Sequence, residues 1–200
     1  MKNIENSPSQ SWQDAFAMNM LGWKTDGFYL EIGAAFPYTI SNTYTLEKQY
    51  GWKGVSVEIS QDLCEKFNLE RSNLCHCLDA TTADYSKLLK EAKAPKRIDY
   101  LQLDIEPAPN TLQALKQMPL NDYRFSVITF EHDLYSDPNN AAVKQEAFDI
   151  LTSAGYQRVV SNVCNSGSPY EDWYVDPLVV DESVWGPVVN SDLDYSQIFV

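Results

Sequence analysis

The sequence lacks the features of a membrane or nucleic-acid-binding protein. Its 200 residues contain no apolar run of roughly 18 or more, so no segment suits a transmembrane helix. Basic residues are scarce, with 15 Lys and Arg against 28 Asp and Glu, which gives a net charge of −13. Duplex nucleic acid and anionic lipid both require clustered positive charge, so we expect neither as a partner. Residues 1–10 have no apolar signal-peptide core, and we expect a cytoplasmic protein.

Metal-binding spacings are also missing. The only histidines are His76 and His132, and the four cysteines form no CxxC pair, which argues against a structural zinc site. The segment around Cys75 and Cys77 alternates in polarity, which favours a strand that buries both cysteines as reduced thiols.

Hydrophobic residues make up 44% of the chain, which is enough for a folded core. Strand and helix patterns alternate from residue 28 to residue 155, which predicts a parallel sheet in an α/β fold. No linker divides the chain, so we expect one domain over residues 1–200, with an N-terminal helix over 9–21 and an extension over 182–200. Strands are expected over 28–33, 54–58, 73–78, 98–103, 125–130, 156–163 and 172–180, and further helices over 41–50, 60–71, 84–94, 110–118 and 141–154.

Five of the expected strands end in an acidic residue. Ligands of such sheets bind beyond the carboxyl ends of the strands, where these side chains would gather. Acids held together at one edge cost free energy unless donors or cations bind them. The expected site therefore includes the strand-end acids Glu31, Glu58, Asp79, Asp104 and Glu131.

The first strand is followed by Gly33, which permits a close backbone approach to a ligand. Glu58 ends the second strand, where an acid commonly binds ribose hydroxyls. This pattern alone does not distinguish NAD from S-adenosylmethionine (SAM) as the cofactor. An NAD-linked sugar-nucleotide oxidoreductase remains an alternative, although GxGxxG and a Tyr-x-x-x-Lys pair are absent. A non-catalytic SAM-binding module is a second alternative.

Several segments resemble FkbM-type SAM-dependent methyltransferases. They are FYLEIGA at 28–34, SNT at 41–43 and GWKG at 51–54, continued by 99–106 and 125–131. The resemblance implies a class I, Rossmann-like methyltransferase with a mostly parallel seven-stranded sheet, helices on both faces and a core over about 26–180. It also implies methyl transfer from SAM to a hydroxyl of a small acceptor, such as a sugar or glycan.

The resemblance further implies which residues contact the cofactor. The strand-end positions would hold the methionine part, the ribose and the adenine in turn, and Asp104 would lie near the transferred methyl. For Ser41 and Asn42, plain helix capping remains an equal alternative. The implied cofactor residues are Glu31, Gly33, Ala34, Ser41, Asn42, Glu58, Ile59, Asp79, Ala80 and Asp104.

His132 follows the fifth strand and is the expected general base, because its ordinary pKa of about 6.5 permits proton uptake near neutral pH. We expect it to converge with Asp104 and Glu131 beside the methyl group. A helix cap or a supporting hydrogen bond is the alternative role of His132. Macrocin-type sugar O-methyltransferases have a similar arrangement of acids, which implies a possible Mg²⁺ site formed by Asp104, Glu131 and His132.

Overall fold

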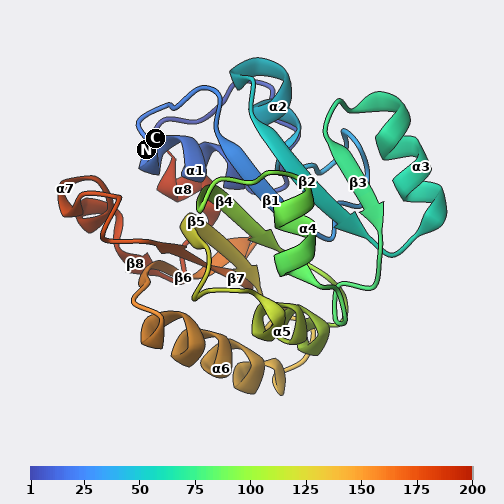
Figure 1. Cartoon of the computed structure of the whole chain (residues 1–200). Coiled ribbons are helices and arrows are strands. Elements are labelled where there is room, and N and C mark those ends of the chain that lie inside the picture. Colours follow the sequence, from blue (N-terminus) through green and yellow to red (C-terminus); the bar gives the residue numbers. More distant parts are fainter. Residues whose placement is uncertain (200) are drawn as a thin grey trace.

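A computed structural model describes residues 1–199 and has one sheet of eight strands at its centre (Figure 1). The strand order is β3-β2-β1-β4-β5-β7-β6-β8, and β7 runs antiparallel to β5 and β6. The expected α/β fold is therefore confirmed. The strands are β1 (Phe28–Ile32), β2 (Lys53–Glu58), β3 (Leu74–Cys77), β4 (Arg97–Leu103), β5 (Arg124–Glu131), β6 (Gln157–Asn165), β7 (Ser168–Val175) and β8 (Asn190–Ser191).

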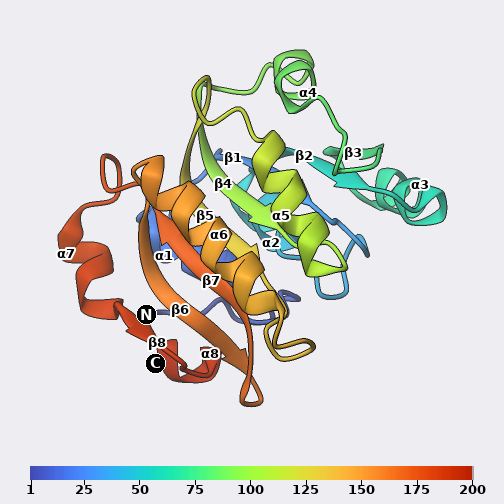
Figure 2. The ribbon, with the colours of Figure 1, turned by 90° about the horizontal axis from the view of Figure 1, so that it is seen from below.

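Helices cover both faces of this sheet (Figure 2). The helices α4, α5 and α6 pack on one face with strand residues such as Leu101 and Ile128, whereas α1 and α8 pack on the other with Tyr100 and Trp173. The helices are α1 (Gln13–Met20), α2 (Tyr44–Tyr50), α3 (Gln61–Glu70), α4 (Tyr85–Glu91), α5 (Ala108–Gln117), α6 (Asn140–Ser153), α7 (Glu182–Trp185) and α8 (Tyr195–Ile198), with a 3-10 turn η1 (Gly186–Val188).

Local sequence signals set several helix ends. The Ser60 hydroxyl accepts a hydrogen bond from Leu63 N–H at 3.4 Å and caps α3. Gly51 ends α2 with a φ of 71°, a left-handed conformation that glycine adopts without steric cost. These residues fix where the chain enters and leaves the sheet, and so where the strand ends lie.

Helix α5 begins earlier than the sequence pattern indicates. The sequence pattern predicts a start at residue 110, but the helix starts at Ala108 with Pro107 as its N-cap. Proline suits a first helical turn, because no intrahelical partner exists there for an N–H. The Thr111 hydroxyl donates instead to the Ile105 carbonyl at 2.6 Å, which ties α5 to the end of β4.

Three further expectations need correction. Cys75 is buried, but Cys77 is exposed, because β3 is a short strand at the sheet edge. The seventh strand covers Ser168–Val175 rather than 172–180, since a turn at Gly167 joins it directly to β6. The extension adds a two-residue eighth strand, β8, that pairs with β6.

The two ends of the described chain lie side by side (Figure 1). The Met1 amino group donates to the Ile198 carbonyl at 3.0 Å. Among residues 1–199, no helix combines the length and the hydrophobicity that crossing a membrane requires.

Candidate functional site

The crevice between β1 and β4 is the point where the strand order reverses, since β1 lies between β2 and β4. Ligands of open α/β sheets bind at such a point. Gly33 follows β1 with a φ of 85°, and a Cβ there would lie 1.7 Å from the Asp104 carbonyl oxygen. Only glycine fits, so the close approach expected at Gly33 is to the backbone after β4. This contact joins the two strand ends that border the crevice.

Glu58 lies at the end of β2 and is half-buried. Its Oε2 accepts from Ala35 N–H at 3.0 Å and its Oε1 from Ser60 N–H at 2.8 Å. Each carboxylate oxygen has a further lone pair for another donor. The next residue, Ile59, exposes 71% of its surface. A carboxylate that can accept further hydrogen bonds thus lies beside an exposed apolar side chain.

Asp79 and Ala80 follow β3 and differ in exposure. Asp79 is exposed, and its Oδ1 accepts from the Thr81 hydroxyl at 2.7 Å and the Thr81 N–H at 2.8 Å. These hydrogen bonds lower the pKa of Asp79. Ala80 is buried, and its carbonyl accepts from the Tyr85 hydroxyl at 2.7 Å. Only Asp79 of this pair has a side chain that reaches solvent.

Glu31 is enclosed by its own chain. It accepts from the Thr43 hydroxyl at 2.9 Å and the Ser56 hydroxyl at 2.6 Å, and its exposed fraction is 1%. Burial raises the pKa of Glu31, although the Arg71 charge and these donors oppose the shift. Its carboxyl group therefore links β1, β2 and the start of α2.

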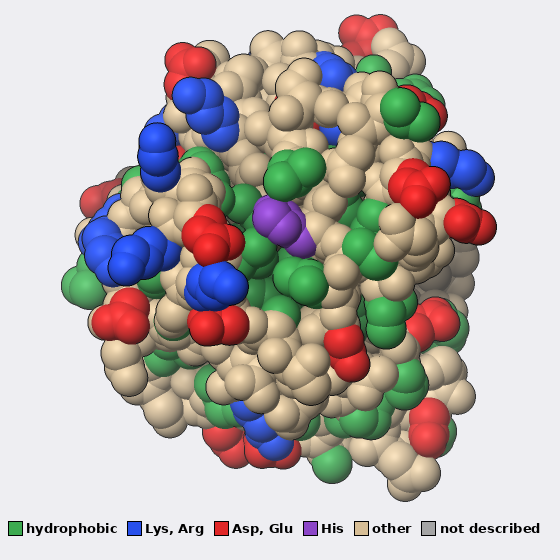
Figure 3. Space-filling view, turned by 45° about the vertical axis from the view of Figure 1, so that its right-hand side comes forward, with side chains coloured by type: hydrophobic (Ala, Val, Ile, Leu, Met, Phe, Trp, Pro, Cys, Tyr) green, Lys and Arg blue, Asp and Glu red, His purple; other side chains and the backbone are tan. Residues whose placement is uncertain are grey.

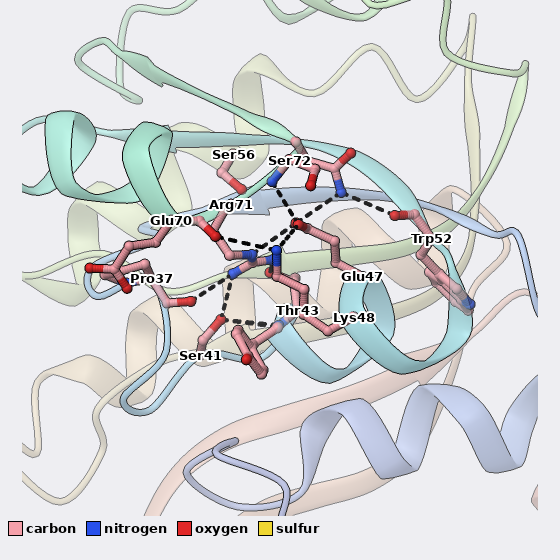
Figure 4. Close-up of polar contacts among 12 residues, drawn as sticks. Pro37, Ser41, Thr43, Glu47, Lys48, Trp52, Ser56, Glu70, Arg71 and Ser72 are labelled. Atoms are coloured by element: carbon pink, nitrogen blue, oxygen red, sulfur yellow. Dashed lines mark hydrogen bonds and ion pairs between the residues drawn. The ribbon is translucent and has the colours of Figure 1, made fainter.

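Arg71 occupies the centre of a buried polar network (Figure 4). It and Glu31 both hydrogen-bond to the Thr43 hydroxyl. Arg71 Nε donates to Glu47 at 2.8 Å, and its Nη1 donates to Ser41 Oγ at 3.2 Å and the Pro37 carbonyl at 3.0 Å. Asn42 Oδ1 accepts from the Ser9 hydroxyl at 2.7 Å. Ser41 and Asn42 thus contact the protein itself.

Ala34 is also buried, and it packs with Cys64, Phe67 and Cys75 under α3. Its N–H donates to the Val57 carbonyl at 3.2 Å. Of the implied cofactor residues, Ala34, Ser41 and Asn42 therefore form internal contacts.

Asp104 and Glu131 converge at the carboxyl ends of β4 and β5. Their carboxyl groups hydrogen-bond to one another. Burial and the neighbouring Asp104 charge raise the pKa of Glu131 well above its ordinary value, so Glu131 supplies the shared proton. Burial also raises the pKa of Asp104, with the charges of Asp133 and Glu106 acting in the same direction.

Two further acids join this pair, and we call Asp104, Glu131, Asp133 and Glu171 the acid cluster. Glu171 lies opposite Glu131 in the antiparallel β5–β7 register, and burial raises its pKa to about 8. Within residues 1–199, Glu171 Oε1 and Asp133 Oδ1 are buried without a hydrogen-bond partner. The residues expected for the site from the sequence include neither acid, because the β5–β7 register that places Glu171 beside Glu131 comes from long-range pairing.

His132 does not converge with Asp104 and Glu131. Its fully buried ring accepts from Leu134 N–H at Nδ1, and Nε2 faces Asp172 Oδ1 at 3.3 Å. The ring thus contacts Asp172 of β7, whereas Glu131 contacts Asp104. The expected convergence is wrong for His132.

Asp172 and its cationic neighbours form a second group of charges. Besides His132, Lys144 Nζ lies 3.3 Å and an Arg158 guanidinium nitrogen 3.0 Å from its carboxylate. Burial alone would raise the pKa of Asp172, but the His132 hydrogen bond and the Lys144 charge lower it to about 2. We call these four residues the Asp172 centre.

The residues expected to hold Mg²⁺ do not form a metal site. Within residues 1–199, no group of three or more His, Cys, Asp or Glu side chains is arranged to hold a metal ion. His132, one of the three expected ligands, faces the Asp172 centre instead. The Mg²⁺ expectation therefore lacks support in the arrangement of these side chains.

A cavity of about 600 Å³ opens beside the acid cluster. Its walls come from the segments that follow β4 and β5, including Pro107, Pro109 and Tyr135. Three acids, Glu106, Asp133 and Asp137, line it as well. The cavity thus connects the carboxyl end of the sheet with solvent.

A larger cavity of about 770 Å³ lies at the other end of the strands. It is lined by residues at the starts of β1, β2 and β3, among them Phe28, Gly54 and Leu74, and by His76. Figure 3 shows hydrophobic side chains around a histidine on this edge of the molecule. This larger cavity therefore lies at the opposite end of the strands from the strand-end acids.

Comparison with known proteins identifies the fold. No protein-family model matches the sequence, and no curated protein matches it in a sequence search. The structure is similar to an O-methyltransferase from Bacillus cereus in complex with S-adenosylhomocysteine (SAH), at 14% identity and a TM-score of 0.54 over 83% of this chain and 79% of that one. It is also similar to the N-methyltransferase NodS from Bradyrhizobium japonicum, at 13% identity and a TM-score of 0.54 over 87% of this chain and 99% of that one.

The chain has the Rossmann-like fold of class I methyltransferases. Both neighbours share its α/β architecture at low sequence identity, so the likeness concerns the fold. Function must be argued from the site, because one fold supports many activities.

Proposed function

We propose that this chain is a SAM-dependent methyltransferase that acts on a hydroxyl group of a small, sugar-like acceptor. The observation that carries the proposal is Glu58, a half-buried carboxylate at the end of β2 with acceptor capacity beside the β1–β4 crevice. The resemblance to the FkbM type agrees with this assignment at the level of the sequence motifs.

The adenosine side of SAM fits the residues present. Glu58 would accept from the ribose hydroxyls, Ile59 offers an exposed apolar surface for the adenine, and Asp79 provides an exposed acceptor near it. On the methionine side, Glu31 would act by positioning, because its oxygens already accept from Thr43 and Ser56. Gly33 would contribute by keeping the strand ends close together.

SAM supplies an activated methyl group on a sulfonium sulfur. The protein then has to align the acceptor and take up its hydroxyl proton; alignment alone supplies up to ~7–11 kcal/mol. We assign proton uptake to Asp104, whose raised pKa makes its carboxylate a stronger base than an ordinary one. Glu131 holds Asp104 by their shared hydrogen bond. His132 is assigned to supporting the Asp172 centre rather than to proton transfer.

Calorimetry with SAM, SAH and NAD tests the cofactor, and an assay for SAH formation with hydroxyl acceptors tests turnover. We expect SAM and SAH to bind to the full chain and NAD not to bind. Tight binding of NAD alone would favour the oxidoreductase. Binding of SAM without SAH formation from any acceptor would favour a non-catalytic module.

A further inference from the structure

The cavity beside the acid cluster has negative charge without a positive partner. It is lined by Glu106, Asp133 and Asp137, and the described residues that line it include no Lys, Arg or His. Within residues 1–199, no ion pair is formed by Asp104, Glu131 or Glu171. Buried acids in such surroundings are stabilised by a cation that arrives from outside.

Asp133 provides an independent sign of a ligand. Its exposed fraction is 6%, it lines the cavity, and its Oδ1 is buried without a hydrogen-bond partner. Its backbone is held in place, because its N–H donates to the Tyr170 carbonyl at 3.0 Å and its carbonyl accepts from Asn140 Nδ2 at 3.0 Å. A fixed acceptor of this kind costs free energy unless a donor occupies it.

We propose that this cavity binds an acceptor that carries a protonated amine, with the ammonium group held by Asp133 and Glu106. This proposal rests on the proposed function and names the substrate class of the same site. An ammonium offers three donors to the carboxylates. The ring of Tyr135, which lines the cavity and is 54% exposed, provides an aromatic surface that also attracts cations.

The shape of the cavity favours an organic cation over a metal ion. Pro107 and Pro109 also line the cavity, and their apolar rings suit the carbon skeleton of an amine. In the part of the chain that the structure describes, no group of acids has the arrangement that a metal ion needs. The amine anchors the acceptor, and the methyl group goes to a hydroxyl on the same molecule.

In that transfer the hydroxyl oxygen forms a bond to the methyl carbon while the carbon–sulfur bond breaks. The electron pair of the broken bond stays on sulfur, which becomes the neutral thioether of SAH. The hydroxyl proton passes to the Asp104 carboxylate. The ammonium group keeps its protons and its charge throughout.

Three matched pairs of sugars test the proposal: glucosamine with glucose, galactosamine with galactose, and mannosamine with mannose. Binding of each to the full chain is measured by calorimetry, with and without SAH. We expect each amino sugar to bind about tenfold or more tightly than its neutral partner, the scale of one charged hydrogen bond. Equal binding within the pairs, no binding by any of the six sugars, or binding of Mg²⁺ in their place would overturn the proposal.

Two variants and a control locate the amine. Asp133→Asn suits the positive φ of 48° at this position, because asparagine tolerates that conformation, and Glu106→Gln changes an exposed side chain. Both should reduce the amine preference by about tenfold. Asp122→Asn removes an exposed charge just before β5, at the end of the strands opposite the site, and should leave the amine preference unchanged.

A preference for amines that survives both variants would contradict the assignment. Failure of the proposed function has a different signature: SAM and SAH would not bind, whatever the six sugars do in the absence of cofactor.

Discussion

The carboxylates near the strand ends fall into two groups with opposite electrostatic surroundings. Asp172 is buried but faces His132, Lys144 and Arg158, and its pKa falls to about 2. Glu171, the residue before it, is equally buried but has no such partner, and its pKa rises to about 8. Adjacent residues of one strand point to opposite faces, so the face decides whether an acid meets cations.

This difference separates acids that stabilise the fold from acids that are available to a ligand. In the Asp172 centre, the carboxylate is paired with the side chains of His132, Lys144 and Arg158. Within residues 1–199, the acid cluster of Asp104, Glu131, Asp133 and Glu171 is not paired in this way, and it lies at the edge where ligands of this fold bind. Acids without a cationic partner therefore mark the candidate site better than acidity alone.

The largest expected effect comes from removing the acid of the Asp172 centre. Asp172→Ala should lower the free energy of unfolding by about 3–5 kcal/mol, because it leaves the partly buried Lys144 and Arg158 without their counter-charge. Urea unfolding at pH 7 measures it, with Asp122→Ala as an exposed control. A loss below about 1 kcal/mol would place Asp172 with ordinary surface acids.

The acid cluster should respond in the opposite direction. Glu171 has a folded pKa of about 8 against about 4.3 when unfolded, so between these values folding requires proton uptake and stability falls as pH rises. Glutamine does not titrate, so Glu171→Gln removes this fall in stability with rising pH. The variant should gain on the order of 5 kcal/mol over the parent at pH 9, with the gain vanishing near pH 4. A gain that does not depend on pH would contradict the assigned protonation.

The cofactor side of the comparison depends on Glu58. Glu58→Ala should weaken SAM binding by roughly 1.5–3 kcal/mol, the scale of hydrogen bonds to a charged group. Calorimetry on the folded variant measures this loss, and Glu70→Ala is the matched control because Glu70 is exposed at the far end of α3. Unchanged SAM affinity in Glu58→Ala would contradict the proposal that Glu58 accepts from the ribose hydroxyls.

The smallest effect is expected for an exposed ion pair. Lys116 Nζ lies 2.6 Å from Glu146, yet 39% and 51% of the two side chains are exposed. Lys116→Ala should change the free energy of unfolding by less than about 1 kcal/mol, since solvent screens the pair. Urea unfolding in low and high salt measures the change. A larger effect would show that distance rather than burial sets the strength of these pairs.

Much of the fold could be predicted from the sequence. Apolar segments, the helix end at Gly51 and the helix start at Ser60 locate β1, α2, β2 and α3 to within a few residues. The strand-end acids follow from this periodicity, because parallel strands bring their carboxyl ends to one edge.

The site itself was only partly predictable. The structure brings Asp104 and Glu131 together, whereas His132 faces Asp172 of β7. Glu171 depends on the register between β5 and β7, which is set by long-range pairing that local patterns do not encode. Proximity in sequence was thus a weaker guide than direction along the strand.

Titration of the side-chain carboxyl groups by carbon NMR tests the central claim most directly. The full chain labelled at Asp and Glu would report Asp172 and Glu171 in one experiment. The account predicts midpoints near 2 for Asp172 and near 8 for Glu171. Midpoints for both residues in the ordinary range near 4 would contradict it, because the two faces of the strand would then treat their acids alike.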